Sequence, residues 1–116
     1  MIATKTPSYP SYKEHHMRKI EQNMLQAIND RRPWSQGNTT VIQHPSYANI
    51  YLHGNLIATV TYTHHNGHFN IVNVHTDTLR QYPTRTTKSR LQALGIRITT
   101  RDQDILYEDL HGVHIV

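Results

Sequence analysis

The chain has 116 residues, the size of one domain with a single small core. It contains no cysteine, which excludes disulfides and thiolate chemistry, and no apolar run approaches the ~18 residues of a membrane-spanning helix. The first residues are too polar for a signal peptide, so we expect a cytoplasmic protein with no membrane partner. We divide the chain into a flexible arm, residues 1–10, and a single α+β domain, residues 11–116.

The first predicted element is a long N-terminal helix. Ser11 and Glu14 fit a capping box, in which both side chains bond free amides at a helix start. Pro33 disfavours helical backbone in the residue before it, so the helix is predicted at about residues 12–30. One apolar stripe repeats at helical spacing along it and consists of Met17, Ile20, Met24, Ala27 and Ile28.

The next segments predict antiparallel strands. Residues 34–38 (WSQGN) predict a turn, and residues 39–44 predict a short strand. Residues 47–75 are rich in Val, Ile, Thr and Tyr, which favour a pleated surface, and predict a three-stranded meander. The Asn-Gly pair at 66–67 is a strong signal for a two-residue hairpin loop. For the other turn, around Gly54, we expect a three-residue loop.

These two loops determine which residues face the core, because successive strand residues alternate between faces. The second loop places Tyr62 opposite Ile71, and the first gives the pairs Leu52–Leu56, Ile50–Ala58 and Ala48–Val60. The predicted core face therefore carries Ala48, Ile50, Leu52, Leu56, Ala58, Val60, Tyr62, Phe69 and Ile71. The opposite face includes Tyr51, Ile57, Thr59, Thr61, Val72 and Val74.

The C-terminal part predicts a second short helix and more strands. Thr86 and Thr87 can cap a helix at residues 88–94, and Gly95 can supply the left-handed residue that follows its end. Strands are expected at residues 96–100, 105–110 and 113–116, of which the first two form a β-hairpin. The predicted fold class is α+β: a long N-terminal helix packed on an antiparallel β-meander, a second short helix and a C-terminal β-hairpin.

Three blocks of sequence resemble a family of small bacteriophage-encoded proteins with the patterns W-x-x-G-N-T-x-V, L-H-G-N-x-I-A and T-x-T-T-K-S-R-L-N-A-L. The blocks are WSQGNTTV at 34–41, LHGNLIA at 52–58 and TRTTKSRLQAL at 84–94. Tyr82 and Pro83 stand where the family has a Gly-Trp pair, and Gln92 stands where Asn is usual. The resemblance implies a phage accessory protein in the host cytoplasm, and it implies no particular activity.

The first candidate site is the basic segment from Arg80 to Arg101, which holds six Lys or Arg residues and no acid. A helix N-terminus offers free amides and a partial positive charge to an anion. Hydroxyl and basic side chains gather at the predicted start of the second helix. We therefore expect binding to the phosphate backbone of DNA or RNA through Arg85, Thr86, Thr87, Lys88, Ser89, Arg90, Arg97 and Arg101. The alternative is a basic surface neutralised by the acids of residues 102–109.

The second candidate site is a protein interface. Residues 38–76 include no Asp, Glu, Lys or Arg, so the sheet face opposite the core, or a strand edge, could bind and inhibit a host protein. The predicted interface residues are Tyr51, Ile57, Thr59, Thr61, Val72 and Val74. Three β-branched aliphatic residues should not face water alone. Either a segment of the chain or another molecule covers them, and we expect a partner, with a homodimer as the simplest case.

The ten histidines invite a metal site. His64, His65 and His68 lie at one predicted hairpin, but a stable zinc site needs a third and a fourth ligand in place. We therefore expect no metal and no cofactor. The sequence also lacks a Gly-rich phosphate loop, a G-x-S-x-G elbow and an H-E-x-x-H motif, so we expect a binding protein and not an enzyme.

Overall fold

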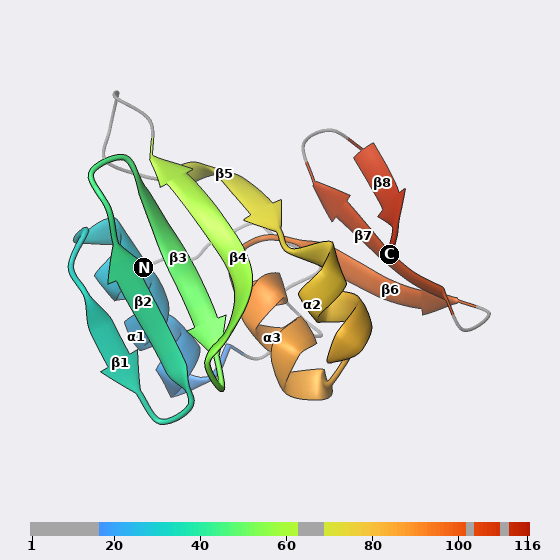
Figure 1. Cartoon of the computed structure of the whole chain (residues 1–116), viewed down its shortest axis with the longest axis horizontal. Coiled ribbons are helices and arrows are strands. Elements are labelled where there is room, and N and C mark those ends of the chain that lie inside the picture. The colour runs from blue at the N-terminus through green and yellow to red at the C-terminus, as the bar shows by residue number, and fades with distance from the viewer. Residues whose placement is uncertain (1–16, 63–68, 102–103, 110–111) are drawn as a thin grey trace, which may run out of the picture.

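A computed structural model describes residues 17–62, 69–101, 104–109 and 112–116 (Figure 1). The predicted arm and the Ser11–Glu14 capping box lie outside the described residues. The elements in chain order are α1 (Lys19–Asn29), β1 (Trp34–Gln36), β2 (Thr39–Gln43), β3 (Tyr47–Leu52), β4 (Asn55–Tyr62), β5 (Phe69–Val74), α2 (Thr76–Gln81), α3 (Arg85–Ala93), β6 (Arg97–Arg101), β7 (Asp104–Asp109) and β8 (Gly112–Ile115).

The strands form two antiparallel sheets. One has five strands in the order β1-β2-β3-β4-β5, and the other has three in the order β6-β7-β8. The mixed α and β composition, the meander and the β6–β7 hairpin confirm the predicted fold class in outline. β8 extends the hairpin to three strands, and the predicted turn at residues 34–38 is instead a hairpin in which β1 pairs with β2.

The helices differ from the prediction in their starting points. α1 begins at Lys19, where the backbone N–H of Arg18 donates to Glu21 Oε1 at 3.1 Å. The first helix is therefore shorter than the predicted 12–30. α3 begins at Arg85 because Thr84, not Thr86 or Thr87, is its N-cap. Gly95 follows its end with φ of +97°, as predicted.

The turn between β3 and β4 has two residues, not three. His53 and Gly54 both have positive φ, 53° and 81°, which is the requirement of a type I′ turn. Leu52 consequently pairs with Asn55. A β-bulge then restores the predicted pairs Ile50–Ala58 and Ala48–Val60, because it leaves Ile57 without an opposite residue. The bulge turns Ile57 inward, where it is 2% exposed.

The pairing of β4 with β5 also differs from the prediction and exchanges the faces of residues 71–74. Tyr62 pairs with Phe69, and the register beyond the irregularity at Thr61 and Tyr62 places Val72 opposite Val60. A shift of one residue moves every side chain of a strand to the other face. Val72 and Val74 therefore lie on the core side, and Ile71 is 47% exposed on the opposite side.

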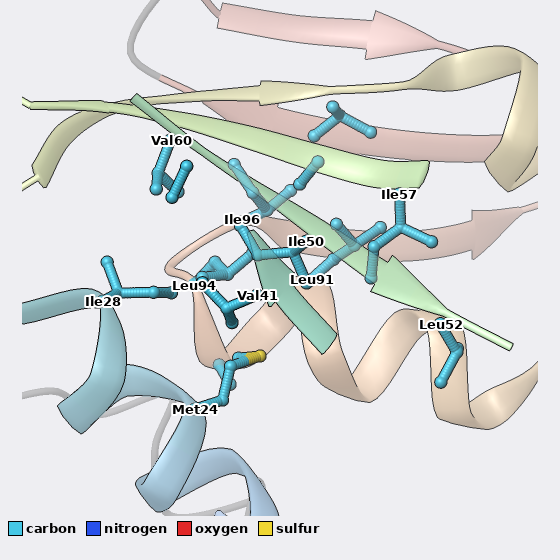
Figure 2. Packing of buried hydrophobic residues seen from close by; sticks show 14 of the residues in the cluster. Met24, Ile28, Val41, Ile50, Leu52, Ile57, Val60, Leu91, Leu94 and Ile96 are labelled. Carbon is cyan, nitrogen blue, oxygen red and sulfur yellow. The ribbon is translucent and has the colours of Figure 1, made fainter. Parts of the chain in front are cut away.

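The core lies between the five-stranded sheet and helices α1 and α3, as Figure 2 shows. α1 contributes Met24 and Ile28, and α3 contributes Leu91. Leu79 of α2 and Tyr107 of β7 belong to the same cluster, so the second sheet packs onto the common core. Helices α1 and α3 cover one face of the five-stranded sheet, and the other face is turned toward the viewer in Figure 1.

Candidate functional site

The three sequence blocks that suggested a phage family meet in one buried polar network. Arg90, in the middle of α3, extends toward α1 and the β1–β2 hairpin. Its Nη1 donates to Glu21 Oε2 at 2.7 Å, and its Nε donates to Thr39 Oγ1 at 3.0 Å. Its Nη2 donates to Asn38 Oδ1 at 3.3 Å. The Arg90 and Glu21 side chains are only 3% and 0% exposed.

Both oxygens of the Glu21 carboxylate have donors. Ser89 Oγ donates to Oε2 at 2.5 Å beside the Arg90 guanidinium, while the Arg18 backbone N–H donates to Oε1. Removing a charge from water is unfavourable unless it is paired and hydrogen-bonded. Ser89 and Arg90 therefore serve to neutralise and solvate Glu21 in the interior.

The β1–β2 turn and the β3–β4 turn join the network through Asn38. Thr39 Oγ1 donates to Asn38 Oδ1 at 2.9 Å, and the His53 backbone N–H donates to the Asn38 carbonyl oxygen at 2.8 Å. The His53 ring nitrogen Nε2 lies 3.5 Å from Asn38 Nδ2. The blocks at 34–41, 52–58 and 84–94 are thus brought together by the fold, and their polar residues hold it.

This burial corrects the exposure that we predicted for part of the basic site. Thr87, Ser89 and Arg90 are 2%, 6% and 3% exposed, so they do not form an open phosphate-binding surface. The reason is helical geometry: Thr87 and Arg90, three positions apart, share the inward face of α3 with Leu91. The Thr87 backbone N–H is also occupied, because it donates to the N-cap hydroxyl of Thr84 at 3.1 Å.

The other predicted basic residues are dispersed. Arg85 is exposed and Thr86 is half-buried at the first turn of α3. Lys88 Nζ donates to Thr100 Oγ1 at 3.2 Å. Arg97 Nε lies 4.0 Å from Glu108 Oε1 across the β6–β7 pair, a contact between a basic and an acidic segment. Arg101 ends β6, and its side chain lies outside the described residues.

The outer face of the five-stranded sheet, which we call the open face, is the second candidate site. Strand pairing places on it Ser35, Thr40, Ile42, Tyr47, Asn49, Tyr51, Thr59, Thr61, Ile71 and Asn73. None of these residues is Asp, Glu, Lys or Arg. Among them, Ile42, Tyr47 and Ile71 are large hydrophobic residues that are 43%, 36% and 47% exposed.

The open face contains half of the interface that we predicted from the sequence. Tyr51, Thr59 and Thr61 lie on it and are half-buried. Ile57 and Val74 were predicted there wrongly, since they are 2% and 6% exposed in the core. Val72 packs against the same core. We expected a partner to cover these three residues, but the core of the chain itself covers them.

A hydrogen-bonded chain of side chains crosses the open face. Thr59 Oγ1 donates to Asn49 Oδ1 at 2.7 Å and lies 2.9 Å from Nε2 of His75, the residue before α2. Burial of the ring lowers the pKa of His75 below its ordinary value. The imidazole is therefore neutral at pH 7, and it adds no charge at this border of the face.

In the described part of the chain, no three His, Asp or Glu side chains gather so that they could hold a metal ion. His64, His65 and His68 lie outside the described residues. None of the described helices is long and apolar enough to cross a membrane.

The fold and this network define a small α+β protein in which hydrogen bonds join three separate sequence blocks, and one sheet face of the described residues is uncharged. The chain belongs to the family of Kyanoviridae Gp96 proteins, whose family model matches residues 17–114. It is therefore a phage protein, and the resemblance to bacteriophage-encoded proteins is confirmed at that level. Comparisons with curated proteins and with solved structures found no match.

Proposed function

We propose that the chain is a phage accessory protein that acts by binding a host protein, without catalysis, through the open face of its five-stranded sheet. The proposed contact residues are Ile42, Tyr47, Tyr51, Thr59, Thr61 and Ile71. We place this activity in the host cytoplasm, since the partner would be a protein of the infected cell.

The observation that carries the proposal is the complete lack of Asp, Glu, Lys and Arg on the open face. Asp, Glu, Lys and Arg make up 17% of the sequence, yet the strand positions that form the open face carry none of them. The centres of protein interfaces are depleted of charged residues and enriched in Tyr. An antiparallel sheet with one solvated face normally alternates apolar and polar residues, and the open face follows that rule with uncharged groups alone.

The geometry also suits a protein partner. The open face is built on strands, so its side chains are held in place, and Thr59, Asn49 and His75 are further fixed by mutual hydrogen bonds. Fixed side chains lose little conformational entropy on binding. Tyr47 stacks on His44, with ring centroids 4.4 Å apart, and presents a rigid apolar surface beside Ile42.

The test is capture of host proteins by the immobilised full chain after nuclease treatment. Thr59→Lys and Thr61→Lys place a charge at the centre of the open face and should abolish capture of any specific partner. Thr99→Lys, at an exposed position on β6, is the matched control and should capture the same protein as the wild type. A partner that binds all three variants equally would contradict the proposed face.

Nucleic-acid binding is the second candidate, favoured by Arg85 and Lys88 at the start of α3. No acidic residue lies in the first turn of that helix. Binding through phosphates should weaken steeply as salt is raised. Arg85→Glu/Lys88→Glu should then abolish it, while both positions lie outside the buried network. If the wild type binds neither DNA nor RNA at low salt, this candidate fails and the open-face proposal is unaffected.

A further inference from the structure

The three-stranded sheet ends in β8, and no strand of the described residues pairs with its outer edge. β8 pairs with β7 along its inner edge (Figure 1). Lys, Pro and inward-pointing charges are among the features that protect such an edge. β8 has none of them. Val113 and Ile115 are 64% and 71% exposed, more than the other exposed large hydrophobic residues of the described chain.

The backbone groups that face outward can be assigned from the ladder. In an antiparallel pair, the N–H and C=O of one residue point to the same neighbour, and those of the next residue point the opposite way. Val116 donates its N–H to the carbonyl oxygen of Ile105 at 2.8 Å, so its backbone groups point toward β7. By alternation, the backbone groups of His114, which is opposite Tyr107, also point toward β7. The N–H and C=O groups of Val113 and Ile115 therefore point away from β7.

We propose that a second copy of this chain occupies this edge, with β8 pairing antiparallel to β8 about a two-fold axis. In the register centred on His114, Val113 lies opposite Ile115 of the second copy. Each such pair exchanges two hydrogen bonds, because both residues direct their backbone groups outward. All the outward N–H and C=O groups of the two residues are then bonded in both copies.

A second copy fits the edge because a two-fold interface must be complementary to itself. Val113 and Ile115 project on the same side of the sheet as Leu106, since Val113 pairs with Glu108 and Ile115 pairs with Leu106. The two-fold axis would join these side chains into one apolar stripe of cross-strand Val–Ile pairs. The pairing also closes on itself and so yields a dimer in place of an open chain.

An introduced cysteine tests the register directly, because the chain contains none. The two His114 residues would form a non-hydrogen-bonded pair with Cα atoms about 4.5 Å apart, within disulfide range. His114→Cys should form a covalent dimer under mild oxidation. Glu108→Cys, exposed on the middle strand, is the control and should stay largely monomeric. Equal or slower cross-linking of His114→Cys than of Glu108→Cys would overturn the proposal.

Charge pairs give a second test that does not depend on oxidation. Val113→Lys/Ile115→Lys places lysines opposite each other across the axis and should sediment as a folded monomer. Val113→Lys/Ile115→Glu places opposite charges there and should sediment as a dimer, although both variants alter the same exposed positions. A wild-type chain that is monomeric at the highest attainable concentration overturns the inference, as does dissociation of both variants. The open face lies on the other sheet, so its proposed function stands or falls separately.

Discussion

The Arg90 guanidinium of α3 lies 2.7 Å from the Glu21 carboxylate of α1, and both side chains are almost fully buried. With Thr39 and Asn38, this pair joins two helices to the first hairpin of the sheet. The sequence predicted that Arg90 would help to bind an anion, but its positive charge is already paired with Glu21 inside the molecule. Arg90 consequently acts as a structural residue.

The first prediction concerns this ion pair. Glu21→Gln leaves the Arg90 charge buried without its counter-ion, and loss of one partner of a buried pair costs about 3–5 kcal/mol of unfolding free energy. Urea denaturation should show this loss.

The control is Arg85→Met, which removes an exposed cation of α3, the helix that carries Arg90. It should change the unfolding free energy by less than about 0.5 kcal/mol. The double variant Glu21→Leu/Arg90→Met should recover part of the loss, and a Glu21→Gln variant as stable as wild type would contradict the role of the pair.

The second prediction concerns the β3–β4 turn. His53 has φ of +53°, a region in which Asn is more readily accommodated than His, and Asn-Gly is the preferred pair of a type I′ turn. His53→Asn should therefore stabilise the fold by about 0.5 kcal/mol. Gly54→Ala, at φ of +81°, is the opposite change and should lower the melting temperature. A lower melting temperature for His53→Asn would instead show that the His53 ring contributes more, through Asn38, than the turn conformation costs.

The sequence predicted the strands better than it predicted their faces. Alternation of apolar residues located β3, β4 and β5, and the Ile50–Ala58 pair was predicted correctly. The bulge at Ile57 could not be foreseen, because a continuous apolar run such as Leu56, Ile57 and Ala58 has no alternation that marks an extra residue. The same difficulty affected β5, where Ile71 and Val72 are equally suited to face the core.

The candidate sites were predicted only in part because a sequence does not say where a charge is buried. Arg85, Lys88 and Arg90 look alike in a basic segment, and only packing against Glu21 distinguishes Arg90 from the other two. A signal was present in the sequence: Glu21 falls at helical spacing from Met17, Met24 and Ile28, within the apolar stripe of the predicted helix. A lone carboxylate on a core face requires a buried partner.

The third prediction checks the corrected faces by comparing two isoleucines. Ile57, 2% exposed, packs in the core, so Ile57→Ala should cost about 2–5 kcal/mol of unfolding free energy. Ile71, 47% exposed, lies on the open face, and Ile71→Ala should cost less than about 1 kcal/mol. Thermal or urea unfolding of both variants decides the matter. The face assignment of β4 and β5 would be wrong if the order of the two effects were reversed.

The last prediction concerns pH and His75, which lies at the border of the open face and hydrogen-bonds with Thr59. Burial lowers the pKa of His75 below the ordinary value of 6.5, so the unfolded chain takes up this proton before the folded chain does. Above pH 6.5 the residue is neutral in both states and its contribution to stability is fully present. That contribution is lost as the pH falls from 6.5 toward the lower folded-state pKa, because the unfolded state binds more protons there.

His75→Gln keeps a side chain that can bond with Thr59 but cannot titrate. The melting temperature of this variant should therefore fall less than that of the wild type between pH 7 and pH 5. Identical pH profiles for the two proteins would show that His75 is as free to take up a proton in the fold as in the unfolded chain.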